Sequence, residues 1–264
     1  MNIFREAARL QEEGTAFAVA TIIESKGSTP RNTGKMLVLK DRSIIGTVGG
    51  GLAEAYIIDA AVEAINIDCS RVVEYKLDKE AAGGIQMLCG GTLKVFIEVI
   101  GKSPEIIMIG AGHVGQAVGK LCDFLDFRLV VVDDREEFAN EQKYPTAKML
   151  AFDKDIIKAI DKISITNNSY IIIATKDSDL SSLKRVIASD AAYIGMIGSR
   201  KKVSRVFEEL LSSGIPMERL GFIHAPVGLN IGAETPEEIA VSILAEILKI
   251  RNGRDGLSLK DSGG

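Results

Sequence analysis

Hydrophobic residues follow two different patterns along this sequence of 264 residues. In the first hundred residues, side chains of like character recur at every second position, at Phe17, Val19, Thr21 and Ile23 and again at Leu93, Val95, Ile97 and Val99. This period of two predicts strands. A helical pattern opens the chain and a second one occupies about 52–64, while further strands are expected at 36–39 and 71–77. The first part of the chain is therefore expected to fold as an α+β unit.

Beyond residue 104, short apolar runs alternate with helical patterns, which is typical of a parallel sheet covered on both faces. The expected strands are 106–109, 129–132, 170–174 and 193–196, and the expected helices are 114–124, 156–160, 180–188 and 201–211. A final helix is expected after Thr235, a candidate N-cap that is followed by proline and two glutamates. The predicted fold class is α/β, with a C-terminal doubly wound parallel sheet preceded by a smaller α+β domain.

A short break, Gly101 to Pro104, separates the two patterns. We therefore expect an N-terminal α+β domain over 1–103 and a cofactor-binding domain over 104–253. A loose polar tail is expected over 254–264.

Composition narrows the functional class. The formal net charge is −4, which argues against broad binding to nucleic acid or to an anionic membrane. The start of the chain does not fit a signal peptide, and no apolar run reaches the ~18 residues of a membrane span. The three cysteines, Cys69, Cys89 and Cys122, form no CxxC pair or zinc spacing. These features predict a cytoplasmic protein without a metal site.

The strongest local motif is a glycine-rich turn between an expected strand and an expected helix. Gly110 permits a tight turn, Gly112 lets the backbone approach a phosphate, and Gly115 lets the helix pack closely on the strand. Asp133 ends the next strand, about 20 residues further on, where an acid can bind a ribose hydroxyl. His113 lies at the mouth of the turn, as a ligand contact or as a surface residue. The motif predicts a Rossmann-like domain that binds a phosphate-bearing cofactor.

A second glycine run precedes the helix expected at 52–64. Gly49, Gly50 and Gly51 can expose several amide groups at once and so form an anion-binding nest, or they can serve only as a flexible turn.

Cys89 is followed by Gly90 and Gly91 just before a strand, so its sulfur is expected to be approachable. Such a thiol can act as a nucleophile, carry sulfur or bind a soft metal, whereas a structural cysteine normally lies within an apolar run.

The expected strand 193–196 runs into Gly198, Ser199 and Arg200 at the start of a helix. Ser199 is a candidate N-cap, and Arg200 would lie near the edge of the sheet where α/β proteins bind ligands. A solvated charged turn is the alternative. His224 lies in a further loop and could meet His113 at one site, although no metal-binding spacing of histidines is present.

Taken together, these segments resemble the xanthine dehydrogenase accessory protein family (XdhC/CoxI) over nearly the whole chain. The matching strings, in family order, are GSTPRNTG (27–34), GTVGGGLAEA (46–55), CGG (89–91), IGAGHVGQAVGKL (109–121), VVDDREEFAN (131–140), YIGMIGSRKK (193–202) and APVGLNIGAETPEEIAVSILAEIL (225–248).

The resemblance implies a non-catalytic assembly factor that binds molybdenum cofactor, a molybdopterin. Such a factor protects the cofactor while a cysteine desulfurase supplies sulfur, and then inserts it into a molybdenum hydroxylase of the xanthine dehydrogenase type. It also implies that Cys89 contacts the cofactor. Many members carry a histidine in the loop that corresponds to 175–179, and this chain has none there, so that role is not transferred. A homodimer is expected, because two-fold assemblies are the commonest.

Two other classes remain open from the sequence. An NAD(P)-dependent oxidoreductase would use the turn at Gly110 and Asp133, but the sequence offers no evident set of proton-transfer residues. A pure interaction scaffold would bind no small ligand at all.

Overall fold

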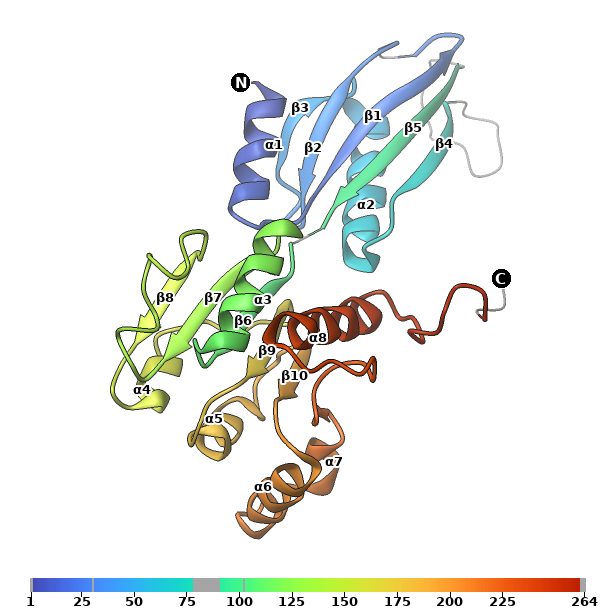
Figure 1. Ribbon diagram of the computed structural model, residues 1–264. Coiled ribbons are helices and arrows are strands. Elements are labelled where there is room, and N and C mark those ends of the chain that lie inside the picture. The colour runs from blue at the N-terminus through green and yellow to red at the C-terminus, as the bar shows by residue number, and fades with distance from the viewer. Residues whose placement is uncertain (1, 30, 78–90, 102, 262–264) are drawn as a thin grey trace. The chain divides into compact units, whose positions relative to one another are not determined.

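The computed structural model describes residues 2–29, 31–77, 91–101 and 103–261 (Figure 1). The chain divides into two compact units, Met1–Ser103 and Pro104–Gly264, called unit 1 and unit 2 below. Each is described by itself.

Unit 1 contains a five-stranded antiparallel sheet in the order β3-β2-β1-β5-β4. Its elements are α1 (Ile3–Glu12), β1 (Phe17–Lys26), β2 (Lys35–Leu39), β3 (Ile44–Thr47), α2 (Gly51–Ile67), β4 (Arg71–Leu77) and β5 (Gly91–Ile100).

The alternation along β1 places two sets of apolar side chains on opposite faces of this sheet. Ala18 and Ala20 pack in one core with Ile57 of α2. Phe17 packs in another core with Leu10 of α1. Each helix therefore covers one face of the sheet, which explains why a strand with alternating character is buried on both sides.

Unit 2 contains a six-stranded parallel sheet in the order β11-β10-β9-β6-β7-β8. Its strands are β6 (Glu105–Ile109), β7 (Arg128–Asp133), β8 (Met149–Phe152), β9 (Ser169–Ile173), β10 (Tyr193–Met196) and β11 (Ile223–His224). Its helices are α3 (His113–Phe124), α4 (Ile156–Ile160), α5 (Asp179–Val186), α6 (Arg200–Ser212), α7 (Met217–Leu220) and α8 (Pro236–Arg251). Because the first strand lies between the second and the fourth, the winding of the sheet reverses at β6. The predicted doubly wound, Rossmann-like fold is confirmed.

Two cores fill unit 2, one on each face of the sheet. Ile106 and Met108 of β6 pack with apolar residues of α3 and α8. Ile107 and Ile109 point to the other face, among apolar residues of α4, α5 and α6. All four side chains have an exposed fraction of 0%, as expected for a strand that is apolar without alternation.

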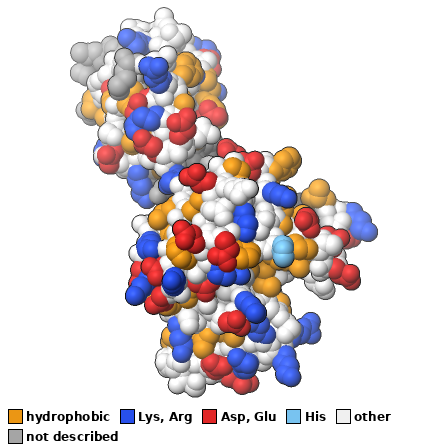
Figure 2. All heavy atoms as spheres, turned by 60° about the vertical axis from the view of Figure 1, so that its left-hand side comes forward, with side chains coloured by type: hydrophobic (Ala, Val, Ile, Leu, Met, Phe, Trp, Pro, Cys, Tyr) orange, Lys and Arg blue, Asp and Glu red, His pale blue; other side chains and the backbone are white. Residues whose placement is uncertain are grey.

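Charges of both signs are intermingled over the face of the molecule in Figure 2. None of the described helices is long and apolar enough to cross a membrane.

Candidate functional site

The glycine-rich turn after β6 is held so tightly that two of its glycines leave no room for a side chain. Gly110 has a φ of 107°, and a methyl group there would overlap the carbonyl oxygen of Ala174. A β-carbon on Gly115 would lie 2.6 Å from the carbonyl oxygen of Gly110. The turn is thus pressed against the end of β9 on one side and against α3 on the other.

Gly112 is different, because it faces open space. It is the N-cap residue of α3, with a φ of −71°, and no described atom beyond its two neighbours in the chain lies within 4 Å of where its β-carbon would stand. No described side chain caps α3, whereas Thr235 caps α8 and Ser199 caps α6. The first amide groups of a helix lack partners within the helix, and the helix dipole favours an anion there. The turn therefore offers an anion site at the edge of the sheet formed by the carboxyl ends of the strands.

Asp133, at the end of β7, is turned into the protein and has an exposed fraction of 1%. One carboxylate oxygen accepts hydrogen bonds from the amide of Ala111 (2.6 Å) and from Nη2 of Arg135 (3.0 Å). The other accepts from the amide (2.9 Å) and Nε (2.8 Å) of Arg135. Burial alone would raise the pKa of Asp133, but the bonds from Arg135 and Ala111 outweigh it and lower that pKa. These four bonds occupy both oxygens, so the carboxylate fastens the turn rather than facing a ligand.

Arg135 follows β7 and lies at the same edge of the sheet as the glycine-rich turn. Its guanidinium lies 3.9 Å from the centre of the Phe138 ring, and Nζ of Lys143 lies 3.9 Å from that ring as well. Two cations thus stack on one aromatic ring beside Asp133.

Tyr144 lies behind the turn and was not anticipated from the sequence. A β-carbon on Gly115 would lie 2.9 Å from its hydroxyl, and one on Gly119 would lie 3.0 Å from its ring. Its hydroxyl is buried and has no hydrogen-bond partner among the residues that the structure describes. Burial raises the pKa of this hydroxyl, and so does the negative charge of Asp133. A buried donor without a partner therefore adjoins the glycine-rich turn.

The loops after β9 and β10 are linked to each other through a buried carboxylate. Asp179, with an exposed fraction of 3%, accepts a hydrogen bond of 2.7 Å from the hydroxyl of Thr175 and pairs with Nζ of Lys202. Ser199 accepts from the amide of Lys202 at 3.3 Å.

Gly198 lies close to the side chain of Lys202. His113 is the first residue of α3 and Arg200 is the first residue of α6, and both residues are exposed. The turn, Asp133 and the start of α6 all follow the carboxyl ends of parallel strands, so the structure brings the candidates of this unit to one edge of its sheet.

In unit 1, the glycine run before α2 is closed by a side chain of the chain itself. Oε2 of Glu54 accepts hydrogen bonds from the amides of Val48 (3.1 Å) and Gly50 (3.1 Å) and from the hydroxyl of Thr47. Burial raises the pKa of Glu54, but these bonds outweigh it, so that the pKa is lowered overall. Gly49, Gly50 and Gly51 all have positive φ, a conformation that favours glycine. In this run, called the nest below, the amide of Gly50 donates to Glu54 and that of Gly49 donates to the hydroxyl of Thr47 at 3.0 Å. Anion binding at the nest stays a prediction.

Three sequence segments meet at this end of unit 1. A β-carbon on Gly91 would overlap the carbonyl oxygen of Ser28, and one on Gly34 would lie 3.1 Å from the carbonyl oxygen of Thr47. Three segments are thus neighbours, namely 27–34, 46–55 and Gly91, which is the last residue of 89–91. Cys89 and Gly90 lie outside the described residues. Among the residues that are described, no group of three or more histidine, cysteine, aspartate or glutamate side chains could hold a metal ion.

The strand order and the uncapped glycine-rich turn define a Rossmann-type binding domain joined to an α+β unit. Residues 106–247 match the model of the XdhC Rossmann domain, and residues 10–76 match that of the XdhC and CoxI family. The chain belongs to the XdhC and CoxI family, and the resemblance noted in the sequence is confirmed.

Three curated relatives show how far the similarity extends. YqeB of Escherichia coli K12 is 39% identical over 99% of this chain and 49% of its own length. A Bacillus subtilis 168 protein named as a probable xanthine dehydrogenase subunit is 31% identical over 61% of this chain and 47% of its own length. The molybdenum cofactor insertion chaperone PaoD of Escherichia coli K12 is 22% identical over 95% of this chain and 88% of its own length. This chain spans about half the length of the first two.

The fold of the whole chain also has a counterpart in a crystal structure. A Bacillus halodurans protein named a xanthine dehydrogenase superposes with a TM-score of 0.52 at 20% identity, covering 99% of this chain and 98% of that one. At this identity the likeness concerns the fold.

Proposed function

We propose that this chain is an accessory factor for molybdenum cofactor. In this role it would protect the cofactor, support its sulfuration and insert it into a molybdenum hydroxylase of the xanthine dehydrogenase type. The observation that carries the proposal is the uncapped start of α3 at the glycine-rich turn, in a domain of the XdhC type. The similarity to PaoD, whose name states insertion of molybdenum cofactor, supports the same role.

The phosphate of the cofactor fits the turn of unit 2 better than it fits the nest of unit 1. At the turn, the amides of Gly112, His113 and Val114 begin a helix without a side-chain cap, and a phosphate could approach Gly112 closely. At the nest, Glu54 already occupies two amides. When bound, the cofactor would supply a metal centre held by dithiolene sulfur. Cys89 remains the candidate contact for that end or for the sulfur that is added to it.

The bonds of Asp133 count against a nicotinamide-dependent oxidoreductase. A dinucleotide domain of the NAD type uses this acid to accept hydrogen bonds from a ribose. Here both oxygens of Asp133 are engaged by the amide of Ala111 and by Arg135. The proposal includes a cysteine desulfurase and a hydroxylase client by family resemblance. It also includes a homodimer, because two-fold assemblies are the commonest.

The test is retention of the cofactor. The protein is loaded with molybdenum cofactor and passed through a gel-filtration column, and its molybdenum and pterin contents are then measured. Gly112→Ala should lower retention about tenfold or more, because its methyl group would stand where the phosphate approaches. Its melting temperature should stay near that of the wild type, because the position is open and its φ suits alanine.

Gly221→Ala is the matched control, since Gly221 follows α7 at the opposite edge of the same sheet, has a φ of −62°, and an added β-carbon would meet one atom, the carbonyl oxygen of Glu218 at 3.3 Å. It should retain cofactor as the wild type does. If the wild type retains none, or if Gly112→Ala retains as much as the control, the proposal is wrong. Cys89→Ala, assayed by activation of the cofactor-free hydroxylase, tests the role of the thiol separately.

A further inference from the structure

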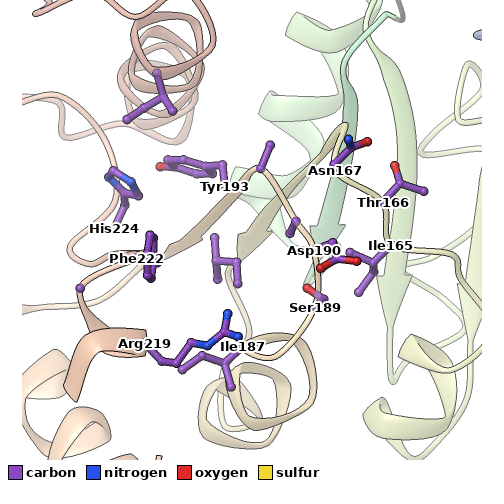
Figure 3. A pocket seen from close by; sticks show the side chains of 15 residues that line it. Ile165, Thr166, Asn167, Ile187, Ser189, Asp190, Tyr193, Arg219, Phe222 and His224 are labelled. Atoms are coloured by element: carbon purple, nitrogen blue, oxygen red, sulfur yellow. The ribbon is translucent and has the colours of Figure 1, made fainter. Parts of the chain in front are cut away.

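Unit 2 has a cavity at the edge of the sheet opposite to the glycine-rich turn. Its volume is about 880 Å³, within the range of pockets that bind small molecules. Its walls come from the segments that precede β9, β10 and β11, together with the end of α8 (Figure 3). Since the turn follows the carboxyl end of β6 in the same parallel sheet, this cavity is separate from the proposed cofactor site.

Two opposite charges line this cavity without pairing. Arg219 of α7 lies on one side, and Asp190, from the loop between α5 and β10, lies on the other (Figure 3). Within the part of the chain that the structure describes, neither side chain forms an ion pair or a hydrogen bond. A planar guanidinium that has no carboxylate of its own chain is suited to receive one from a ligand.

His224, on the same side of the cavity as Arg219 and Phe222, is held in a fixed orientation (Figure 3). Its ring stacks on Tyr193 with 4.6 Å between the ring centres, and its Nδ1 lies 3.6 Å from Oε1 of Glu246. Glu246 also accepts hydrogen bonds from the hydroxyl of Tyr193 (2.5 Å) and from the amide of Gly228 (2.9 Å). Burial raises the pKa of Glu246, but these bonds and that of His224 outweigh it and lower the pKa to about 2. The ionised Glu246 therefore fixes the His224 ring as a rigid part of the cavity wall.

The remaining lining is largely apolar and suits the body of a ligand. Phe222, with an exposed fraction of 70%, lies beside His224, and Ile187 lines the floor (Figure 3). An exposed aromatic ring next to a guanidinium offers a stacking surface and an anion contact together.

We propose that this cavity binds a small monocarboxylic acid with an apolar body, whose carboxylate contacts Arg219 and whose body packs on Phe222. Asp190, on the opposite wall, would repel a second carboxylate and so select a monoanion over a dianion. The site is independent of the proposed cofactor function.

The test uses two probes that differ in charge, N-acetylphenylalanine and N-acetylphenylalaninamide. Titration of the full-length protein by calorimetry or NMR should give saturable binding of the acid, with a Kd on the order of 1 mM. The amide should bind about tenfold more weakly, because it has no carboxylate for Arg219. Arg219→Gln should abolish the difference between the probes.

Arg205→Gln is the control, since Arg205 lies on α6 outside this cavity and 81% of its side chain is exposed. It should bind both probes as the wild type does, and both variants should keep the melting temperature of the wild type. In addition, the wild type should prefer N-acetylphenylalanine over phenylsuccinate, and Asp190→Asn should narrow that preference. Equal binding of acid and amide, unchanged binding in Arg219→Gln, or no saturable binding of the acid would each overturn the proposal.

Discussion

Two buried tyrosine hydroxyls of unit 2 have opposite surroundings. The hydroxyl of Tyr193 donates to Glu246 at 2.5 Å, whereas that of Tyr144 has no partner in the described part of the chain. A hydrogen bond to a charged group contributes about 1.5–3 kcal/mol, while a buried hydroxyl without a partner costs about 1–3 kcal/mol. Removal of each hydroxyl therefore isolates one of these two effects.

We expect Tyr193→Phe to lower the free energy of unfolding by about 2 kcal/mol and Tyr144→Phe to leave it unchanged or to raise it by about 1 kcal/mol. Urea unfolding of the two variants beside the wild type measures both effects, and each variant is the control for the other because the same atom is removed from a buried tyrosine. A loss at Tyr144 as large as that at Tyr193 would show that the Tyr144 hydroxyl has a partner.

At the scale of the element, the turn between β6 and α3 depends on one glycine conformation. Gly110→Ala should destabilise unit 2 by about 3 kcal/mol, because alanine is strained at a φ of 107° and its methyl group would overlap the carbonyl oxygen of Ala174. Thermal unfolding followed by circular dichroism checks this. Gly112→Ala is the comparison, since the same added methyl group meets open space. Equal stabilities of the two variants would contradict this account of the turn.

Elements with a strong periodic or apolar pattern could be predicted from the sequence. The strand 193–196 and the helix 156–160 were predicted with the bounds of β10 and α4, and the bounds predicted for α3, α5 and α6 lie within two residues of those observed. The short elements β3, β8, α7 and β11 were not predicted. Each has four residues or fewer, so its pairing or packing with neighbours stabilises it more than its own pattern does.

The candidate site was predictable only in part. Glycine spacing predicted the turn after β6 and offered the nest as one of two interpretations, because both depend on local backbone geometry. The partners of Asp133 and Glu54 could not be predicted, because a carboxylate beside a glycine-rich turn can face a ligand or bond to the turn itself. Tertiary contacts with Arg135 and with the amide of Ala111 decide this for Asp133.

At the scale of the whole molecule, each unit has its own cores. The two cores of unit 1 contain only residues from that unit, and the same holds for the two cores of unit 2. A domain with a complete core can fold alone.

A fragment of residues 104–264 should therefore unfold in one cooperative thermal transition and keep the helical circular dichroism of unit 2. Calorimetry of the fragment beside the full chain measures this. A fragment that gives no transition would show that unit 2 needs residues 1–103 in order to fold, and the boundary at Pro104 would then not separate independent domains.

The carboxylate of Glu54 has a consequence for any anion that approaches the nest of unit 1. Because Glu54 is part of the chain, it competes at an effective concentration that dilution cannot lower. A phosphate at the nest must displace this built-in competitor, whereas one at α3 meets no described side chain that caps the helix. Two glycine-rich turns of this chain thus differ in their state before any ligand arrives, one closed by the chain itself and the other left open.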